Sequence, residues 1–363
     1  MSSMFADPRR RNLAILAGVA LLTIIAAVLG VFHQAGFSER RERPELFFPG
    51  LVDHVRQIAH IRIRSKDGTV DVVFKPEKTW VVANKDDYPA SHEQVRATVI
   101  AMATLTQMEK KTDRADWLPY VDLTSPEHGG TGKEITILDD KGHVMASIIT
   151  GKSVDIGDPE GAIGLFVRRP GETQSWLARA AIEPKGDLSD WLEKEVMTID
   201  RARIAEAVVD PLSGPSYTVH RDKPSDADFK LNDIPKGREL AYDAAPDTVA
   251  AAVVDFAFED VKPARNFDFM DATHTARVVT KTFDGLVVTV NVIQQNGAYW
   301  ATVSADGTAP DARNEARQID DRASGWAYKL PAFKGQQFME PLESLLKPKG
   351  APTTPTATPQ QAQ

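Results

Sequence analysis

The sequence predicts an α+β protein in which an N-terminal transmembrane helix precedes two tandem related lobes of antiparallel sheet with packed helices. Three observations lead to this fold class. Residues 13–32 carry no charge, alternating apolar runs are separated by turn dipeptides such as Asp67-Gly68, and one order of elements occurs twice after residue 55. Alternation with a period of two is typical of half-buried strands, whereas apolar residues every three to four positions are typical of helices.

The apolar segment 13–32 predicts a membrane anchor. Its twenty uncharged residues follow three arginines at 9–11 and precede a charged run at 39–43. As a helix it would measure roughly 30 Å, the thickness of a bilayer's hydrocarbon core. The alternative is a cleaved signal peptide, but such a peptide has an apolar core of about 7–15 residues and a small-residue cleavage site. Residues 28–30 are a poor match to such a site, so we expect the segment to be retained.

The orientation follows from the flanking residues. The short basic tail at 1–12 favours the cytoplasm, and long C-terminal domains are translocated largely regardless of their charge. We therefore expect a single-pass protein of the bacterial inner membrane, with its N-terminus inside and its body in the periplasm. Inner-membrane lipid is then its first expected partner.

The first lobe is expected at residues 55–200, after a linker at 33–54. It opens with a hairpin, because alternating runs at 58–64 and 70–74 flank Asp67-Gly68. Ser91 and Gln94 then have the spacing of a capping box. The apolar face of the helix that follows is formed by Val95, Val99, Met102, Leu105 and Met108. Further strands are predicted at 80–82, 134–138, 144–150, 165–168 and 175–178, with a short helix at 187–194.

The second lobe is expected at residues 201–346 and repeats this order. Strands are predicted at 204–209, 217–221 and 229–231, followed by a helix from Pro246 that places Val249, Val253, Phe256 and Ala257 on one face. A three-strand meander at 276–282, 286–293 and 299–304 turns at Asp284-Gly285 and Asn296-Gly297. Residues 326–346 predict an edge strand and a closing helix. The Pro-, Thr- and Gln-rich residues 347–363 predict a disordered tail.

The composition excludes several classes of function. The chain has no cysteine, so disulfides, thiolate metal sites and cysteine nucleophiles are excluded. Its net charge is −8 and its basic residues are scattered, which argues against a nucleic-acid partner.

Two segments resemble catalytic or binding motifs without completing them. Residues 146–153 fit a loose phosphate-binding loop, but the helix that such a loop needs is not predicted after them. We interpret them as a strand followed by a turn. His92-Glu93 begins like a zinc-protease helix, but Arg96 occupies the position of the second histidine ligand. His92 and Glu93 are therefore expected in an exposed first helical turn.

The remaining candidates are also interpreted as structural. Residues 213–217 lack the Gly-x-Ser-x-Gly pattern of a nucleophile elbow and are expected to form a loop that enters a strand. Five tryptophans beside predicted elements are expected to be core anchors: Trp80, Trp176, Trp191, Trp300 and Trp326. The sequence thus predicts no catalytic, cofactor-binding or metal-binding residue, and no cofactor.

Several segments together resemble a known family. They are Leu46–Leu51 (Leu-Phe-Phe-Pro-Gly-Leu), Trp80–Val82, 190–200, 325–333 and 342–346. They are similar to the domain-of-unknown-function four-three-four-zero family of bacterial single-pass envelope proteins. The resemblance implies an association with gliding-type ABC transporter systems. It implies no catalytic residues.

Three functions are compatible with these observations. The first is a non-enzymatic accessory or scaffold protein that contacts a membrane protein, such as an ABC transporter or its auxiliary subunit. The second is a module that binds cell-wall glycan or lipid, which would require exposed tryptophans along a groove. The third is an envelope hydrolase with carboxylates or a serine in a cleft between the lobes. We expect the first.

Overall fold

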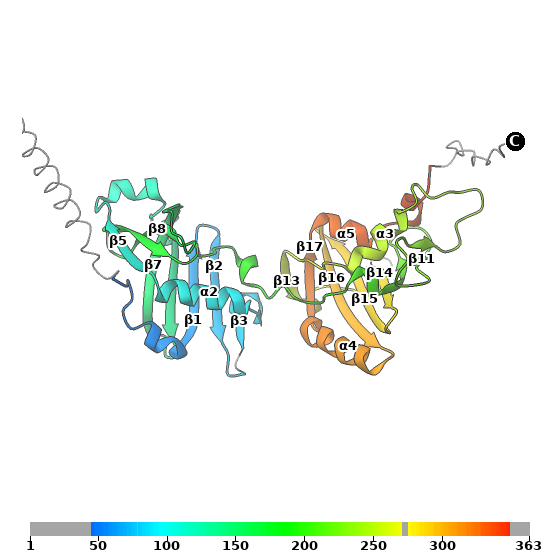
Figure 1. Cartoon of the computed structure of the whole chain (residues 1–363), viewed down its shortest axis with the longest axis horizontal. Helices are drawn as coiled ribbons and strands as arrows, with labels where there is room; N and C mark the ends of the chain where they lie inside the picture. The colour runs from blue at the N-terminus through cyan, green and yellow to red at the C-terminus, as the bar shows by residue number, and fades with distance from the viewer. Residues whose placement is uncertain (1–44, 78, 271–274, 349–363) are drawn as a thin grey trace, which may run out of the picture.

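The structure is a computed structural model that describes residues 45–77, 79–270 and 275–348, and these residues form two lobes, each built on one antiparallel sheet (Figure 1). Within them the first sheet has nine strands and the second has eight, with only four α-helices. The helices are α2 (His92–Ala103), α3 (Ala245–Ala250), α4 (Pro310–Ala323) and α5 (Ala332–Phe338). The predicted α+β class is therefore wrong, because the fold is dominated by two antiparallel sheets with few helices.

Local backbone features explain why the predicted helices are shorter than expected, whereas α4 was not predicted from the sequence. The helix from Pro246 ends at Ala250, continues as the 3-10 turn η7 (Ala251–Val253), and the chain then adopts a left-handed conformation at Asp255 (φ 50°). The helix predicted at 187–194 is only the 3-10 turn η5 (Leu188–Trp191). The closing helix is divided into α5 and η9 (Leu342–Leu345) by Pro341, which lacks the N–H that a continuous helix requires.

The predicted terminal segments cannot be compared with the structure. The basic tail at 1–12, the transmembrane helix at 13–32, the linker as far as residue 44 and the tail from residue 349 lie outside the described residues. Across 45–77, 79–270 and 275–348, no helix combines the length and the apolar character needed to cross a bilayer.

The first sheet is ordered β4-β3-β2-β1-β6-β7-β8-β9-β5. Its strands are β1 (Ile58–Ser65), β2 (Gly68–Phe74), β3 (Trp80–Val82), β4 (Tyr88–Pro89), β5 (Thr106–Lys110), β6 (Lys133–Asp139), β7 (Val144–Val154), β8 (Ile163–Arg168) and β9 (Ser175–Ala180). The 3-10 turn η1 (Val52–Gln57) precedes β1, and three others lie between strands: η2 (Ala83–Lys85), η3 (Ala115–Val121) and η4 (Pro126–His128).

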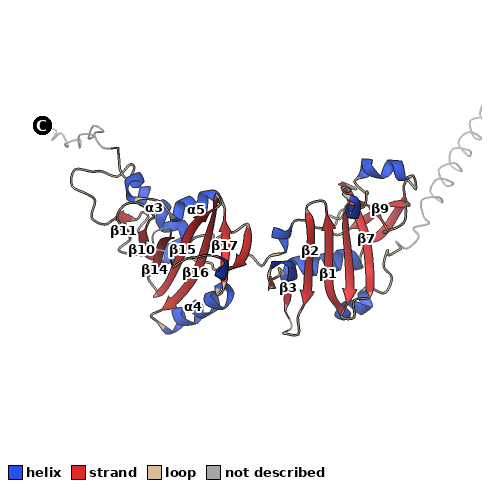
Figure 2. Cartoon of the chain, turned by 180° about the vertical axis from the view of Figure 1, so that it is seen from behind, coloured by secondary structure: helices blue, strands red, loops and turns tan. Residues whose placement is uncertain are grey.

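The second sheet is ordered β12-β11-β10-β14-β15-β16-β17-β13. Its strands are β10 (Ile204–Asp210), β11 (Tyr217–His220), β12 (Lys230–Leu231), β13 (Asp260–Pro263), β14 (Thr275–Thr282), β15 (Leu286–Gln295), β16 (Ala298–Gly307) and β17 (Trp326–Leu330). Two further 3-10 turns are η6 (Arg201–Arg203) and η8 (Ala264–Asn266). Figure 2 shows the strands of both sheets from behind, with α4 below the second one.

The two sheets share one plan. The opening strands, four in the first lobe and three in the second, are followed by a helix, and the strand after that helix crosses to the far edge, where β5 lies beyond β9 and β13 lies beyond β17. The register also shifts at the same place, between Ile58 and His60 in β1 and between Ile204 and Glu206 in β10. A bulge that recurs at one position of the same strand indicates that the lobes are structural repeats.

The predicted hairpins are confirmed. Only half of the capping box forms, because the side chain of Gln94 donates to Thr98 and the backbone N–H of Ser91 donates to the carbonyl of Trp191. Asp67 and Gly68 connect β1 to β2, and Asn296-Gly297 connects β15 to β16 with positive φ at both residues (52° and 76°). That conformation is the one a type I′ turn requires. The side chain of Ser91 accepts a hydrogen bond from the backbone of Gln94 at 3.3 Å. The meander of β14, β15 and β16 also lies where the sequence predicted it.

The lobes meet through unlike edges of their sheets. Tyr88 of β4 lies edge-on to Trp326, with ring centroids 5.0 Å apart, and to Phe258 at 6.0 Å. Lys85 forms an ion pair with Asp260 of β13 at 2.5 Å. Buried apolar side chains of both lobes belong to one continuous cluster, so the lobes share a core across this contact.

The opposite edge of the first sheet is covered by the start of the described chain. The backbone N–H of Phe47 donates to the carbonyl of Leu105 at 2.8 Å, and that of Gln107 donates to the carbonyl of Glu45 at 2.8 Å. Leu46 thereby forms an antiparallel bridge with Thr106 of β5. Residues 45–47 therefore protect an edge that would otherwise present unpaired backbone groups.

Candidate functional site

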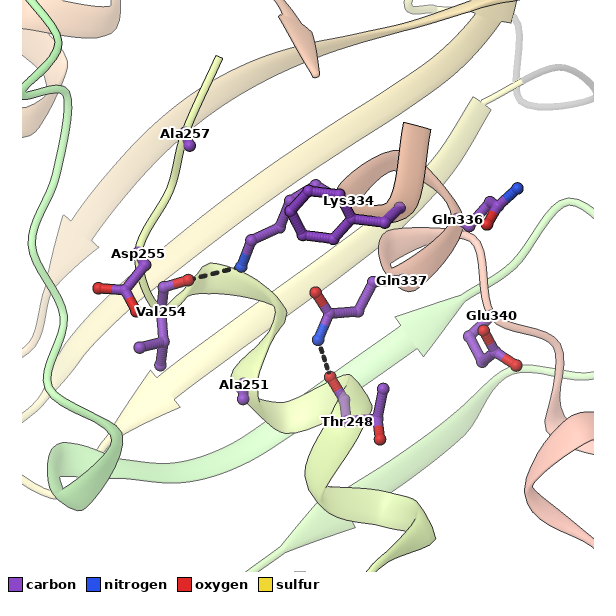
Figure 3. Close-up of a pocket in the computed structure, with 10 residues that line it drawn as sticks. Thr248, Ala251, Val254, Asp255, Ala257, Lys334, Gln336, Gln337 and Glu340 are labelled. Carbon is purple, nitrogen blue, oxygen red and sulfur yellow. Dashed lines mark hydrogen bonds between the residues drawn. The ribbon is translucent and has the colours of Figure 1, made fainter. Parts of the chain in front are cut away.

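The best-formed candidate site is a groove of about 750 Å³ in the second lobe (Figure 3). It lies between the segment of α3 and η7 on one side and α5 on the other. Small and apolar side chains supply much of its surface, and amide side chains accompany them. Its lining residues are Thr248, Ala251, Val254, Asp255, Ala257, Phe333, Lys334, Gln336, Gln337 and Glu340. We call it the α3–α5 groove.

Lys334 joins the two sides of the groove. Its Nζ donates to the carbonyl oxygens of Val254 at 2.7 Å and Ala252 at 3.3 Å, at the end of η7. A cation at a helical C-terminus satisfies carbonyls that have no partner within the helix. Burial lowers the pKa of Lys334, and the Asp255 carboxylate opposes this shift. A lysine with a lowered pKa is a candidate nucleophile, but this one donates to the backbone and holds α5 against η7.

A second hydrogen bond supports the same arrangement. The side-chain amide of Gln337 donates to the carbonyl of Thr248 in α3. On the other side of α5, Gly335 packs so closely on Tyr299 of β16 that an added Cβ would lie 2.1 Å from the ring. The position of α5 is therefore fixed from both sides. Phe333 remains 66% exposed in the groove lining.

The α3–α5 groove thus offers apolar contact with defined polar groups around it. Its lysine and one of its glutamines are paired with backbone carbonyls. Such a surface suits an apolar segment of a binding partner, which buries its side chains against Phe333 and the alanines.

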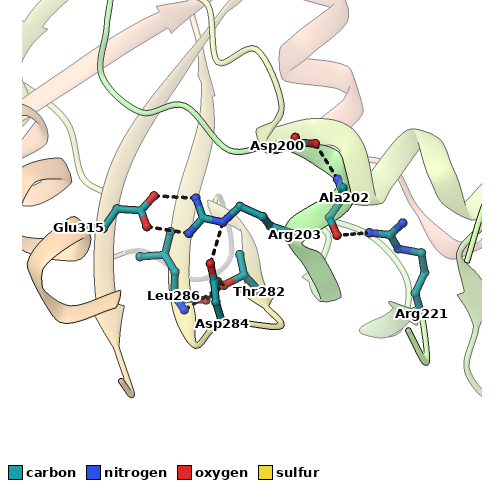
Figure 4. Close-up of polar contacts among 8 residues, drawn as sticks. All are labelled: Asp200, Ala202, Arg203, Arg221, Thr282, Asp284, Leu286 and Glu315. Carbon is teal, nitrogen blue, oxygen red and sulfur yellow. Dashed lines mark hydrogen bonds and ion pairs between the residues drawn. The ribbon is translucent and has the colours of Figure 1, made fainter. Parts of the chain in front are cut away.

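A second polar cluster of the second lobe surrounds Arg203 (Figure 4). Arg203 of η6 donates to Glu315 of α4 at 2.9 and 2.6 Å and to Asp284 of the β14–β15 turn at 2.8 Å. These hydrogen bonds, with Glu315 first, raise the pKa of Arg203. The bidentate geometry is typical of a strong arginine–carboxylate pair. Both carboxylates come from this chain, so the cluster fastens α4 to the sheet.

Arg221 has a similar structural role nearby. It is buried, and its Nη2 donates to the carbonyls of Arg201 at 2.6 Å, Ala202 at 3.1 Å and Ile204 at 2.7 Å. Its guanidinium also lies over the ring of Phe229, 4.4 Å from the centroid. Burial lowers the pKa of Arg221. The guanidinium of Arg221 thus satisfies backbone carbonyls of η6 and of the start of β10, so its role is structural.

The family model for the domain of unknown function DUF4340 matches residues 80–307, which is more than half of the chain. The chain belongs to the DUF4340 family. The match runs from β3 to the end of β16 and therefore covers parts of both lobes. No curated protein and no solved structure matches the chain.

The resemblance predicted from sequence is thus confirmed for the family. Within the α3–α5 groove, Thr248 to Ala257 belong to the matched segment, whereas the residues of α5 follow it. The family description names no activity, so the chemistry of this DUF4340 protein has to be argued from its own residues.

The incomplete motifs lie in a strand, in the first turn of a helix and in a loop. Residues 146–153 lie within β7, which continues to Val154, so the strand is confirmed and the predicted turn is wrong. His92 and Glu93 are exposed in the first turn of α2. Residues 213–217 lead into β11, as predicted. Among the residues that the structure describes, no group of three or more metal-binding side chains comes together.

The tryptophans mostly occupy core positions. Trp191 and Trp300 are buried, whereas Trp80, Trp176 and Trp326 are half-buried and pack on the core. The α3–α5 groove contains none of them.

Sequence reasoning missed two exposed aromatic features. Trp117 of η3 is 51% exposed, and Phe333 was assigned only to a closing helix. Nothing in the local sequence distinguishes these two side chains from core residues.

Proposed function

We propose that this DUF4340 protein is a non-enzymatic accessory protein that binds a membrane protein partner through the α3–α5 groove. The observation that carries the proposal is the apolar groove of about 750 Å³ with Phe333 66% exposed in its lining. Exposed large apolar side chains gathered in a groove are typical of interaction sites. The occupant that fits best is an apolar segment of the partner, with the side-chain amide of Gln336 at the groove to bind its backbone.

The location of the protein is part of the same proposal. The uncharged segment 13–32 and the arginines before it support attachment to the inner membrane, with the body in the periplasm. The family resemblance supports an ABC-type transport complex as the first partner to test.

The alternatives receive less support. A glycan-binding platform of tryptophans is not favoured, because Trp191 and Trp300 are buried. A hydrolase was expected to use a cleft between the lobes. Two further grooves, of about 230 and 340 Å³, are both lined by residues of the first lobe, and the α3–α5 groove lies in the second. None of these three grooves lies between the lobes, so none of them supplies the expected cleft.

Co-purification tests the proposal directly. Full-length protein is purified from detergent-solubilised membranes, and the recovered transport-complex subunits are quantified by mass spectrometry. Phe333→Asp places a charge in the groove and is expected to reduce recovery at least about tenfold, which corresponds to about 1.4 kcal/mol of binding free energy. The matched control is Val144→Asp, because Val144 is 61% exposed on the first lobe. If no membrane protein is recovered, or if both variants behave alike, the proposal is wrong.

A further inference from the structure

A second exposed aromatic surface lies in the first lobe, on the 3-10 turn η3. Trp117 is 51% exposed and Tyr120 is 74% exposed. We call these two residues the η3 aromatic pair. Between them in the chain, Leu118 is buried and packs with Leu123 and Ile149. One side of η3 is therefore anchored in the lobe while the aromatic pair is directed toward solvent.

Further contacts hold the turn in place. The Nζ of Lys152 in β7 donates to the carbonyl of Tyr120 at 2.9 Å, and the backbone of Leu123 donates to the carbonyl of Leu118 at 3.0 Å. Pro119 lies within the turn and restricts its backbone. The exposure of the aromatic pair is thus a feature of an ordered, fixed element.

The charges around the pair are balanced. Arg114 lies 5.3 Å from the Trp117 ring centroid and is paired with Asp116 at 2.7 Å. Lys111 is paired with Glu109 at 2.6 Å. Because these charges are paired, the surface around the η3 aromatic pair is not strongly basic. A partner surface would therefore be bound through the aromatic rings and not through charge. Tryptophan and tyrosine are the side chains enriched at the headgroup level of membranes, where an apolar ring and a polar tip are both accommodated.

The start of the described chain points toward the same end of the lobe. Glu45 pairs with Gln107, and the pairing is antiparallel. Glu45, where the described chain begins, therefore lies beside the part of β5 that leads through Lys110 to η3. In Figure 1 the start of the coloured chain and the turquoise turn of η3 both lie near β5. The described chain thus begins beside β5, the strand that leads to η3.

The length of that segment limits how far the lobe can be from a membrane. Twelve residues, 33–44, separate the apolar segment 13–32 from Glu45. Twelve residues can span at most about 40 Å. Such a short tether gives η3 a high effective concentration at the surface into which segment 13–32 inserts.

We propose that the η3 aromatic pair rests in the headgroup region of the membrane and forms a second contact beside the N-terminal attachment. The inference rests on the membrane attachment in the proposed function, and goes beyond it by naming the surface and its lipid partner. It also has a consequence for the α3–α5 groove. In Figures 1 and 2, α3 and α5 lie toward the same side of the molecule as η3. A first lobe oriented by η3 therefore directs the groove toward the membrane, where a membrane protein partner lies.

The test uses a single cysteine in full-length protein, because the natural chain has none. Asp116→Cys places an environment-sensitive dye in η3 and leaves both aromatic residues intact. The protein is reconstituted alone in phosphatidylcholine vesicles that contain a lipid with a quencher near its headgroup. The matched control is Val144→Cys, since Val144 starts β7 and lies eight residues, or about 26 Å along the strand, from Lys152.

Quenching is expected to be at least about threefold greater at position 116 than at position 144, because only η3 enters the interface. Trp117→Ala combined with Tyr120→Ala, in the Asp116→Cys background, is expected to lower it to the level of the control. Quenching is also expected to persist at high salt, where contacts between exposed charges are screened. Near-UV circular dichroism confirms that each variant keeps its tertiary structure.

The possible outcomes separate the two proposals. If the protein does not float with the vesicles, the membrane attachment itself is wrong. If it floats but position 116 is quenched no more than position 144, the η3 inference alone is overturned. Quenching that survives loss of the aromatic pair, or that disappears at high salt, overturns it as well. A dye response that depends on protein concentration and not on lipid would assign the surface to a second copy of the chain.

Discussion

Truncation of Tyr88 is expected to destabilise both lobes together. The side chain is 3% exposed at the contact between them, where it lies against Trp326, Phe258 and Tyr328. Its hydroxyl donates to the carbonyl of Glu193 at 3.0 Å. Replacement of a buried aromatic side chain by alanine costs about 3–5 kcal/mol, because transfer free energy is lost and a cavity remains. We expect Tyr88→Ala to lower the free energy of unfolding by this amount.

A conservative variant separates packing from hydrogen bonding. Tyr88→Phe keeps the ring contacts and removes only the hydroxyl, so about 1 kcal/mol is expected. The matched control is Tyr242→Ala, because Tyr242 is 58% exposed; a surface substitution of this kind changes stability by about 0.5 kcal/mol at most.

Urea unfolding of the full-length protein in detergent measures these differences. Tryptophan fluorescence is the signal, since Trp191 and Trp300 are buried on the two sides of the contact and report on both lobes. One common transition is expected for the natural protein, because the apolar core is continuous. The reasoning is refuted if Tyr88→Ala costs less than about 1 kcal/mol, or no more than Tyr242→Ala.

Three further predictions concern other parts of the fold. Gly335→Ala is expected to cost about 1–3 kcal/mol by overpacking against Tyr299, where the new Cβ would lie 2.1 Å from the ring, and the melting temperature of the variant checks this. Glu315→Gln removes a half-exposed ion pair and is expected to cost only about 0.5–1 kcal/mol while amide exchange in α4 becomes faster; unchanged exchange would contradict the role given to this contact. The hydrogen bond from Arg179 holds the pKa of Asp158 at about 2, below its ordinary 3.8, so the carboxylate stabilises the fold above pH 3.8 and this contribution is lost as the pH falls toward 2. Thermal unfolding of Asp158→Asn should therefore depend less on pH between these values than that of the natural protein, and equal slopes would disprove the assignment.

Local signals in the sequence predicted the hairpins well. Asn296-Gly297 and Asp67-Gly68 specify turns through their own backbone preferences, so the strands beside them could be placed without knowledge of the rest of the chain. The N-cap at Ser91 is equally local. By contrast, the crossing of β5 and β13 to the far edges of their sheets depends on pairing with strands distant in sequence, for which no local pattern exists.

The candidate site was less predictable than the strands. The α3–α5 groove exists because Lys334 binds the carbonyls at the end of η7 and because Gly335 fits against Tyr299. Each of these contacts joins residues that are many positions apart in the chain. An exposed Phe333 and a buried phenylalanine look the same in a helical pattern, so the sequence predicted a closing helix but could not identify its binding surface.

The head-to-tail contact of the two lobes has a consequence for assembly. Because the β4 side of the first lobe meets the β13 side of the second, identical units joined in this way would add further units and form a ring or an open filament. The strand of the first lobe that corresponds to β13 is β5, and Leu46 already occupies its edge. A second molecule therefore cannot bind the β5 edge of the first lobe in the way that the β4 side binds β13, and the head-to-tail arrangement stops at the two lobes of one chain.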